Sequence, residues 1–267
     1  MSNLALRVLT GAVALPLVGL LTLWHQRLGF ALLVFLFCAL GLTELTKLTL
    51  AGVPRAQRIA VIVIGVALSM ALYARPGLAL VWLLAAAAAT ATAILAHPGE
   101  IESATVRLAL ATFGVFYLGG FSAPLALLQR DLPDGPFWVF VAIAVTFAND
   151  TGAYFAGRFL GRHKLYPAIS PSKTVEGAVG GLVGGLIIAW VCRVTFFAEL
   201  TVRDCLLVAV PGAVLGPLGD LLESMIKRSA GVKDSGRLLP GHGGVLDRVD
   251  ALLFVTAWIY AYTTLIR

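Results

Sequence analysis

Acidic side chains recur in this sequence where long apolar runs begin or end. They are Asp150 in TFANDTGAY, Asp220 and Glu223 in GPLGDLLES, and Asp247 and Asp250 in LDRVD. Carboxylates that two helix ends bring together repel one another, and a divalent cation between them removes that repulsion. Hard oxygen ligands favour Mg²⁺, which tends to share the phosphate oxygens of a substrate. The pattern therefore predicts a magnesium site that holds a phosphate-bearing substrate.

The loop between the last two acidic segments is rich in positive charge. It supplies Lys227, Arg228, Lys233, Arg237 and Arg248. These cations match phosphate groups, and the glycines of PGHGG at residues 240–244 let main-chain amides approach an anion closely. Carboxylates for a metal together with cations for phosphate indicate phosphoryl or nucleotidyl transfer. The alternative, that the loop only fixes membrane topology, does not explain Asp220 or Asp247.

Residues 220–227 have helical spacing. In a helix, Asp220, Glu223, Ser224 and Lys227 stand at i, i+3, i+4 and i+7, so they share one face. Ser224 is expected to make a local hydrogen bond within that helix. Such a face can meet the carboxylates that open the next helix across a single loop.

A second basic loop contains SPSKT, residues 170–174, which ends like a phosphate-binding P-loop. The G-x-x-x-x-G-K pattern is missing and no strand is expected before it, so a P-loop is excluded. Ser172, Lys173 and Thr174 are expected at the start of a helix, where the helix dipole favours phosphate. Simple capping of that helix, with Glu176 contributing, is the alternative interpretation.

The composition identifies the elements that must position these groups. The 267 residues are 59% hydrophobic and 13% charged, with a mean hydropathy of +0.92, which is typical of a membrane protein and not of a soluble domain. The net charge is +6, and the basic residues lie mostly in short loops between apolar runs, as expected for a membrane protein. This distribution argues against a nucleic-acid partner. The three cysteines lack metal-site spacing and are expected to be packing residues.

Nine apolar segments are long enough to cross a bilayer. We therefore predict an all-α, polytopic membrane protein, with residues 1–267 forming one domain. The eighth segment contains Pro211 and Pro217 and is expected to be kinked or broken. The segments are centred near Pro16, Phe37, Val66, Ala87, Tyr117, Val145, Leu186, Val210 and Trp258.

The distribution of basic residues predicts the orientation. With nine spans, 14 of the 20 Lys and Arg residues fall on the face that carries the N-terminus and both basic loops, so that face is expected to be cytoplasmic. The polar site then faces the cytoplasm from a bacterial-type inner membrane. The seventh segment carries paired glycines, Gly180 with Gly184 and Gly181 with Gly185, which suit close helix packing within the chain or at a dimer interface.

Residues 224–250 resemble the signature of the phosphatidate cytidylyltransferase family, whose members are also called CDP-diglyceride synthetases. Every constrained position of that signature is filled. The matching residues are Ser224, Ile226, Lys227, Arg228, Lys233, Asp234, Gly236, Pro240, His242, Gly243, Gly244, Asp247, Arg248, Val249 and Asp250. The resemblance extends through NDTGAYFAGR, SPSKTVEG and GDLLES, and so covers most of residues 148–250. Ala251 departs from the serine of many relatives, which argues against a polar contact at that position.

The resemblance implies a magnesium-dependent reaction of CTP with phosphatidate, a membrane lipid, that gives CDP-diacylglycerol and pyrophosphate. It implies multiple membrane helices, often in homodimers. Asp220 and Asp247 are implied as metal ligands, with a second, monovalent cation such as K⁺ as an option between them. Glu223, Asp234 and Asp250 are implied as supporting groups.

The remaining candidate residues are expected to serve the substrates. Lys227, Arg228, Lys233 and Arg248 would reduce the repulsion between the two anionic substrates, and His242 belongs to the catalytic signature without an assigned proton-transfer role. The expected substrate-binding residues are Asp150, Ser172, Lys173, Thr174, Glu223, Ser224, Gly243 and Gly244.

Three alternatives remain open at the level of sequence. One is a different CTP-dependent lipid enzyme, such as a polyprenol kinase or a cytidylyltransferase for another lipid acid. An ion-coupled transporter also uses intramembrane carboxylates and interrupted helices, although no inverted repeat is visible and the charges gather at one face. A structural scaffold would tolerate alanine at Asp220 and Asp247.

Overall fold

The computed structural model describes residues 3–24, 26–236, 238 and 243–267. The long elements are helices joined by short connections. In chain order they are α1 (Asn3–Leu23), α2 (Leu28–Thr49), α3 (Arg55–Ala74), the 3₁₀ turn η1 (Pro76–Leu78), α4 (Ala79–Leu95), α5 (Ile101–Gly114), the π-helical η2 (Val115–Gly120), α6 (Phe121–Asp131), α7 (Gly135–Phe159), β1 (Lys164–Tyr166), β2 (Ser170–Thr174), α8 (Val175–Thr195), α9 (Val202–Ser229) and α10 (Leu246–Leu265).

The helical architecture confirms the all-α, polytopic class. Each of the nine predicted segment centres lies within a helical stretch, and the fifth stretch is α5, η2 and α6 in succession. Among the described residues, seven helical stretches are long and apolar enough to cross a membrane. These stretches are Leu28–Thr49, Arg55–Ala74, Pro76–Leu95, Ile101–Asp131, Gly135–Phe159, Val175–Thr195 and Val202–Ser229.

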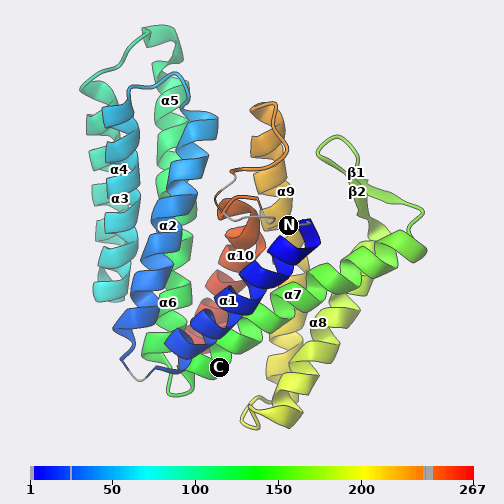
Figure 1. Cartoon of the computed structure of the whole chain (residues 1–267). Helices are drawn as coiled ribbons and strands as arrows, with labels where there is room; N and C mark the ends of the chain where they lie inside the picture. Colours follow the sequence, from blue (N-terminus) through cyan, green and yellow to red (C-terminus); the bar gives the residue numbers. More distant parts are fainter. Residues whose placement is uncertain (1–2, 25, 237, 239–242) are drawn as a thin grey trace. The chain divides into compact units, whose positions relative to one another are not determined.

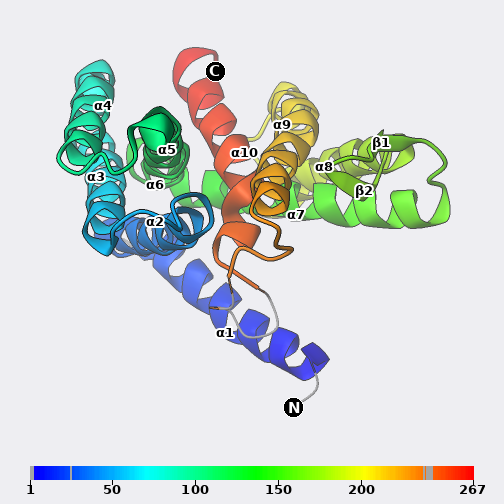
Figure 2. The ribbon, with the colours of Figure 1, turned by 90° about the horizontal axis from the view of Figure 1, so that it is seen from above.

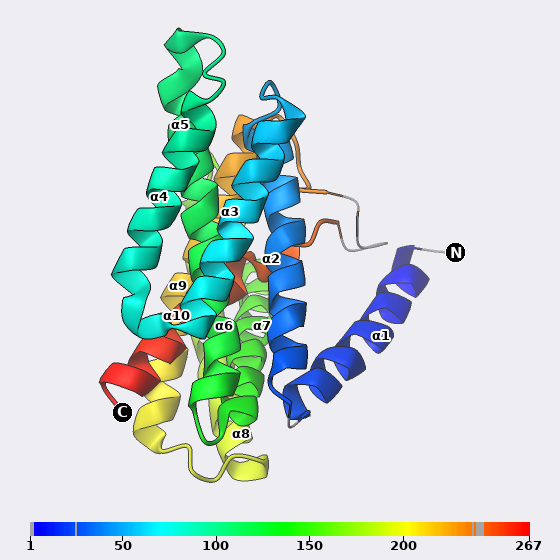
Figure 3. The same cartoon turned by 90° about the vertical axis from the view of Figure 1, so that its left-hand side faces the viewer.

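The chain forms two compact units, and each is assembled from two separate stretches of sequence. The first unit comprises Met1–Leu127 and Ser229–Arg248, and the second comprises Leu128–Arg228 and Val249–Arg267. In the first unit, α2, α3, α4 and α5 pack side by side (Figures 1 and 3). The organisation of residues 1–267 as one domain stays a prediction.

In the second unit, α7 and α8 lie side by side along their length (Figure 2). The glycines of α8 make this close approach possible. A Cβ atom on Gly184 would lie 2.6 Å from the carbonyl oxygen of Ala148, and one on Gly180 would lie 2.8 Å from the carbonyl oxygen of Gly152. These glycines therefore serve packing within the chain, which is one of the two predicted uses.

Replacing Gly184 with alanine is expected to destabilise the protein by about 1–3 kcal/mol, because the added methyl group meets the α7 backbone, which cannot move aside cheaply. Thermal denaturation of the detergent-solubilised protein, followed by loss of the monodisperse chromatographic peak, measures the effect. Gly19→Ala is the matched control, since a Cβ atom at Gly19 would meet nothing within 4 Å. Equal thermal stability of the two variants would show that α7 and α8 do not pack through this glycine.

Of the two outcomes predicted for the eighth segment, a break is wrong, since α9 runs without interruption from Val202 to Ser229, and a kink stays a prediction. Pro211 has no N–H, so the carbonyl of Leu207 one turn earlier loses its helical donor. The indole Nε1 of Trp258 on α10 donates to that carbonyl at 2.7 Å. A donor from a neighbouring helix thus replaces the missing bond, and the helix continues through the proline.

The loop before α8 also differs from expectation, because residues 170–174 form a strand. β2 pairs with β1 in an antiparallel hairpin, with Lys164 opposite Thr174 and Tyr166 opposite Ser170. The prediction that no strand precedes SPSKT is therefore wrong. Two short strands of three and five residues carry too little apolar alternation to be recognised in the sequence.

Candidate active site

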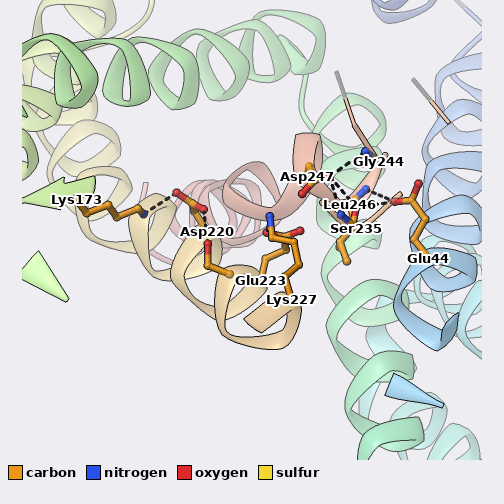
Figure 4. A network of polar contacts seen from close by, with 10 residues as sticks. Glu44, Lys173, Asp220, Glu223, Lys227, Ser235, Gly244, Leu246 and Asp247 are labelled. Carbon is orange, nitrogen blue, oxygen red and sulfur yellow. Dashed lines mark hydrogen bonds and ion pairs between the residues drawn. The ribbon is translucent and has the colours of Figure 1, made fainter. Parts of the chain in front are cut away.

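The last turns of α9 carry the predicted face of acidic and basic side chains. Ser224 donates a hydrogen bond through Oγ to Asp220 Oδ1 at 3.3 Å, which confirms the expected local bond. One turn further on, Lys227 forms an ion pair with Glu223, whose side chain is fully buried (Figure 4). The helical spacing of these residues is therefore a correct guide to their arrangement.

Three carboxylates converge in the second unit. Oxygen atoms of Asp220, Glu223 and Asp250 all lie within 4.8 Å of one another. Asp250 is 8% exposed and belongs to the first turns of α10. Gly219 permits this approach, because a Cβ atom there would lie 2.9 Å from the ring of Phe254 and 3.1 Å from the carbonyl carbon of Asp250. The absence of one side chain on α9 thus lets α10 bring a third carboxylate to the group.

Lys173 joins this acidic group from the hairpin. Its Nζ lies 2.7 Å from Asp220 Oδ2 and donates to the carbonyl oxygen of Pro217 at 3.2 Å (Figure 4). Thr174 has a different role, since its Oγ1 caps α8 by accepting a hydrogen bond from the Gly177 amide at 3.0 Å. Ser172 is exposed. The capping interpretation of SPSKT therefore holds for Thr174. Lys173 reaches the acidic group, and its contact with phosphate stays a prediction.

Glu176, in the first turn of α8, is bonded to the loop before the hairpin. Its carboxylate accepts hydrogen bonds from the backbone amides of Arg162 and His163 at 3.0 and 3.2 Å. It also lies 2.6 Å from Nδ1 of His163. Glu176 therefore connects α8 to residues 162 and 163, which come just before β1. The cap of α8 itself is Thr174.

The acidic group fits a divalent cation. Its carboxylates are hard oxygen donors of the kind that Mg²⁺ prefers. Lys173 pairs with Asp220 and Lys227 pairs with Glu223 at its edges. Carboxylates so close together, two of them buried, repel one another, and a cation among them offsets that repulsion. Asp220, Glu223 and Asp250 are thus the residues of the second unit that could hold a metal ion.

Asp247 lies in the first unit, where its carboxylate contacts the connection between α9 and α10, residues 230–245, which we call the signature loop. Oδ2 accepts hydrogen bonds from the Ser235 amide at 3.0 Å and the Gly244 amide at 2.9 Å, and it lies 3.0 Å from the Ser235 hydroxyl oxygen (Figure 4). Gly243 has φ of +85°, a conformation that favours glycine. Gly243 therefore has a backbone conformation that suits glycine, three residues before α10 begins.

Residues 5–266 match the family described as the cytidylyltransferase family. The chain belongs to the cytidylyltransferase family. Its curated relatives include phosphatidate cytidylyltransferases from Staphylococcus haemolyticus (strain JCSC1435), 48% identical over 122 residues, and from Bacillus subtilis (strain 168), 45% identical over 126 residues. These matches cover 46% and 47% of this chain, and 47% of each relative. The aligned stretch thus spans about half the length of the relatives.

Other residues of the signature lie at the surface. Arg228, Lys233, Asp234 and Arg248 are exposed, as is Asp150 of the NDTGAY segment. Exposure leaves the cations accessible to an anionic ligand. His242 lies outside the described residues, so the structure does not bear on its predicted place in the site.

Sequence reasoning missed two polar residues of this family member. Asn149, which precedes Asp150, is 2% exposed and donates through Nδ2 to the carbonyl oxygen of Gly212 on α9 at 3.2 Å. Glu44 is 6% exposed and lies inside the chain's second apolar run. A buried acidic residue inside a membrane segment is itself a functional signal. That signal could have identified Glu44. It was missed because Glu44 lies inside an apolar segment, whereas the predicted acidic residues lie at the ends of such segments.

Proposed function

We propose that this protein transfers the cytidylyl group of CTP to phosphatidate, giving CDP-diacylglycerol and pyrophosphate. The observation that carries the proposal is the group formed by Asp220, Glu223 and Asp250 beside Lys173 and Lys227. Carboxylates for a metal ion and cations for phosphate are what nucleotidyl transfer requires. Similarity to relatives named phosphatidate cytidylyltransferase supports the choice of CTP and this lipid.

In this reaction a phosphate oxygen of phosphatidate attacks the α-phosphorus of CTP, and the bond from that phosphorus to pyrophosphate breaks. The attacking oxygen is already anionic, so the protein needs no general base. Bringing two repelling anions into alignment is the main requirement. Mg²⁺, when bound, supplies charge neutralisation at the phosphates and the leaving pyrophosphate. Asp220, Glu223 and Asp250 are the proposed ligands in the second unit.

The cationic side chains have a separate proposed task. Lys173 and Lys227, which pair with the carboxylates, would also attract the triphosphate to the acidic group. The exposed side chains of Arg228, Lys233 and Arg248 would lower the repulsion between the substrates. The amides of Gly243 and Gly244, the side chain of Ser224 and the exposed Asp150 and Ser172 stay proposed substrate contacts. The signature's Asp234 and His242 stay predicted members of the site.

A second metal-ligand prediction from the signature also stays a proposal. Asp247 is the proposed partner of Asp220 in metal binding, with a monovalent cation such as K⁺ as an additional occupant of the site. The backbone amides of Ser235 and Gly244 both donate to Oδ2 of Asp247 and so fix the position of this carboxylate.

The proposed setting is a bacterial inner membrane. The seven apolar helical stretches support a multi-pass protein, and the excess of Lys and Arg in the loops on one side supports a cytoplasmic site. CTP would then enter from the cytoplasm and phosphatidate from the bilayer. A homodimer stays part of the proposal.

Labelled CTP tests the reaction directly. Purified protein in detergent is incubated with phosphatidate and CTP that carries ³²P at either the α or the γ position, with Mg²⁺ and with EDTA. The α label is expected in the lipid fraction only with Mg²⁺, together with one released pyrophosphate per labelled lipid. Transfer of the γ label to lipid would indicate a lipid kinase instead. Absence of both labels from the lipid, across phosphatidate and other lipid acids, would favour a transporter or scaffold.

A further inference from the structure

Glu44 on α2 connects the signature loop to a distant part of the sequence. Its carboxylate accepts hydrogen bonds from the Ser235 hydroxyl at 3.0 Å, the Val245 amide at 3.1 Å and the Leu246 amide at 2.9 Å. Figure 4 shows Glu44 beside Ser235 and Leu246. The first of these bonds joins residues 191 positions apart. One buried side chain therefore contacts the signature loop at Ser235 and again where the loop meets α10.

The contacts of Glu44 satisfy groups that would otherwise be buried without partners. Val245 and Leu246 are 2% and 0% exposed, and Leu246 begins α10. The first amides of a helix lack acceptors within the helix, and the positive end of the helix dipole favours a carboxylate there. Glu44 thus acts as the N-terminal cap of a helix from another part of the chain, and this offsets the cost of burying its charge.

The loop is shaped closely around this carboxylate. A Cβ atom on Gly236 would lie 2.8 Å from Cδ of Glu44, and one on Gly244 would lie at the same distance. The Ser235 hydroxyl lies 3.0 Å from Glu44 and 3.0 Å from Asp247. Two signature glycines therefore leave room for Glu44, and one hydroxyl joins its carboxylate to that of Asp247.

We propose that Glu44 is a positioning residue for the signature loop. It acts through Ser235, Val245 and Leu246 without touching substrate. Fixing Ser235 orients Lys233 and Asp234 just before it, and fixing Val245 orients the amides of Gly243 and Gly244, which are proposed phosphate contacts. The inference rests on the proposed function, and it adds a residue that lies outside both the signature and residues 148–250.

Glu44→Gln tests this role because it keeps the shape and replaces one accepting oxygen by an NH₂ group, which faces an amide or hydroxyl donor. The expected result is a KM for CTP raised by about 10- to 100-fold with a smaller change in kcat, since misplacement of the loop weakens nucleotide binding first. Glu102→Gln is the matched control, because Glu102 is exposed in the first turn of α5. Its kinetics are expected to equal those of the unaltered protein.

A double-mutant cycle separates positioning from general destabilisation. If Glu44 acts through Ser235, the variant that combines Glu44→Gln with Ser235→Ala should show a fold increase in KM for CTP well below the product of the fold increases of the two single variants. Independent, multiplicative effects would overturn that route. Wild-type KM for CTP in a folded Glu44→Gln variant would overturn the proposal as a whole.

Amide hydrogen exchange tests the contacts without any substrate. Peptides that contain Val245 and Leu246 are expected to exchange at least about tenfold faster in Glu44→Gln than in Glu102→Gln, because their amides lose an acceptor. Unchanged exchange would overturn the capping role. Since this measurement needs no turnover, it distinguishes failure of the Glu44 inference from failure of the proposed reaction, in which the unaltered protein itself would label no lipid.

Discussion

Asp220→Asn is expected to lower magnesium-dependent CTP turnover by on the order of 100- to 1000-fold, while folded, membrane-inserted protein is still produced. Asp220 is shared by three interactions: the carboxylate group with Glu223 and Asp250, the ion pair with Lys173 and the hydrogen bond from Ser224. The amide retains the size of the side chain and removes its charge. Loss of activity would therefore report on that charge and not on packing.

The measurement is release of pyrophosphate from CTP in the presence of phosphatidate, with Mg²⁺ varied. Asp134→Asn is the matched control, because Asp134 precedes α7 and makes no capping hydrogen bond through its side chain. This control should behave like the unaltered protein. Near-normal turnover in Asp220→Asn would remove the residue from the proposed metal site.

Asp247→Asn is expected to lower turnover to a similar extent, for two reasons that can be separated. Oδ2 of Asp247 accepts hydrogen bonds from the backbone amides of Ser235 and Gly244, and an NH₂ group in its place would face those donors. If Asp247 is also a metal ligand, the Mg²⁺ concentration that gives half-maximal activity should rise by about tenfold or more.

Ser235→Ala provides the comparison for that experiment, since it removes one loop contact and no carboxylate. Its Mg²⁺ requirement is expected to equal that of the unaltered protein even where its KM for CTP rises. An Asp247→Asn variant with reduced activity and an unchanged Mg²⁺ requirement would contradict the ligand prediction. Asp247 would then hold the loop only.

The helical fold was open to prediction because its signals are local. A run of about 20 apolar residues specifies a membrane helix without reference to the rest of the chain. The same locality explains why Asp220, Glu223, Ser224 and Lys227 could be placed on one face. The prediction of a break in the eighth segment failed because a residue distant in sequence supports the helix at its proline. The indole of Trp258 supports α9 at Pro211, and nothing near Pro211 in the sequence announces it.

Part of the candidate site follows from residue types and part from packing. Carboxylates and cations between residues 220 and 250 indicate metal and phosphate chemistry without any knowledge of geometry. Which carboxylates meet depends on how α10 lies against α9, and Gly219 allows Asp250 to reach Asp220 and Glu223. Likewise, the hairpin delivers Lys173 to Asp220 across 47 residues, a separation that helical periodicity cannot bridge.

By itself, the sequence determined the membrane-helical class, the family and the kinds of groups that a phosphate-transfer site needs, because periodicity, hydropathy and signature spacing are properties of adjacent residues. Only the tertiary structure decided that Asp250 completes an acidic group with Asp220 and Glu223, and that Glu44 caps α10. Both contacts join segments that are separate in sequence, and hydrogen-bond geometry and close packing form only once those segments have folded together.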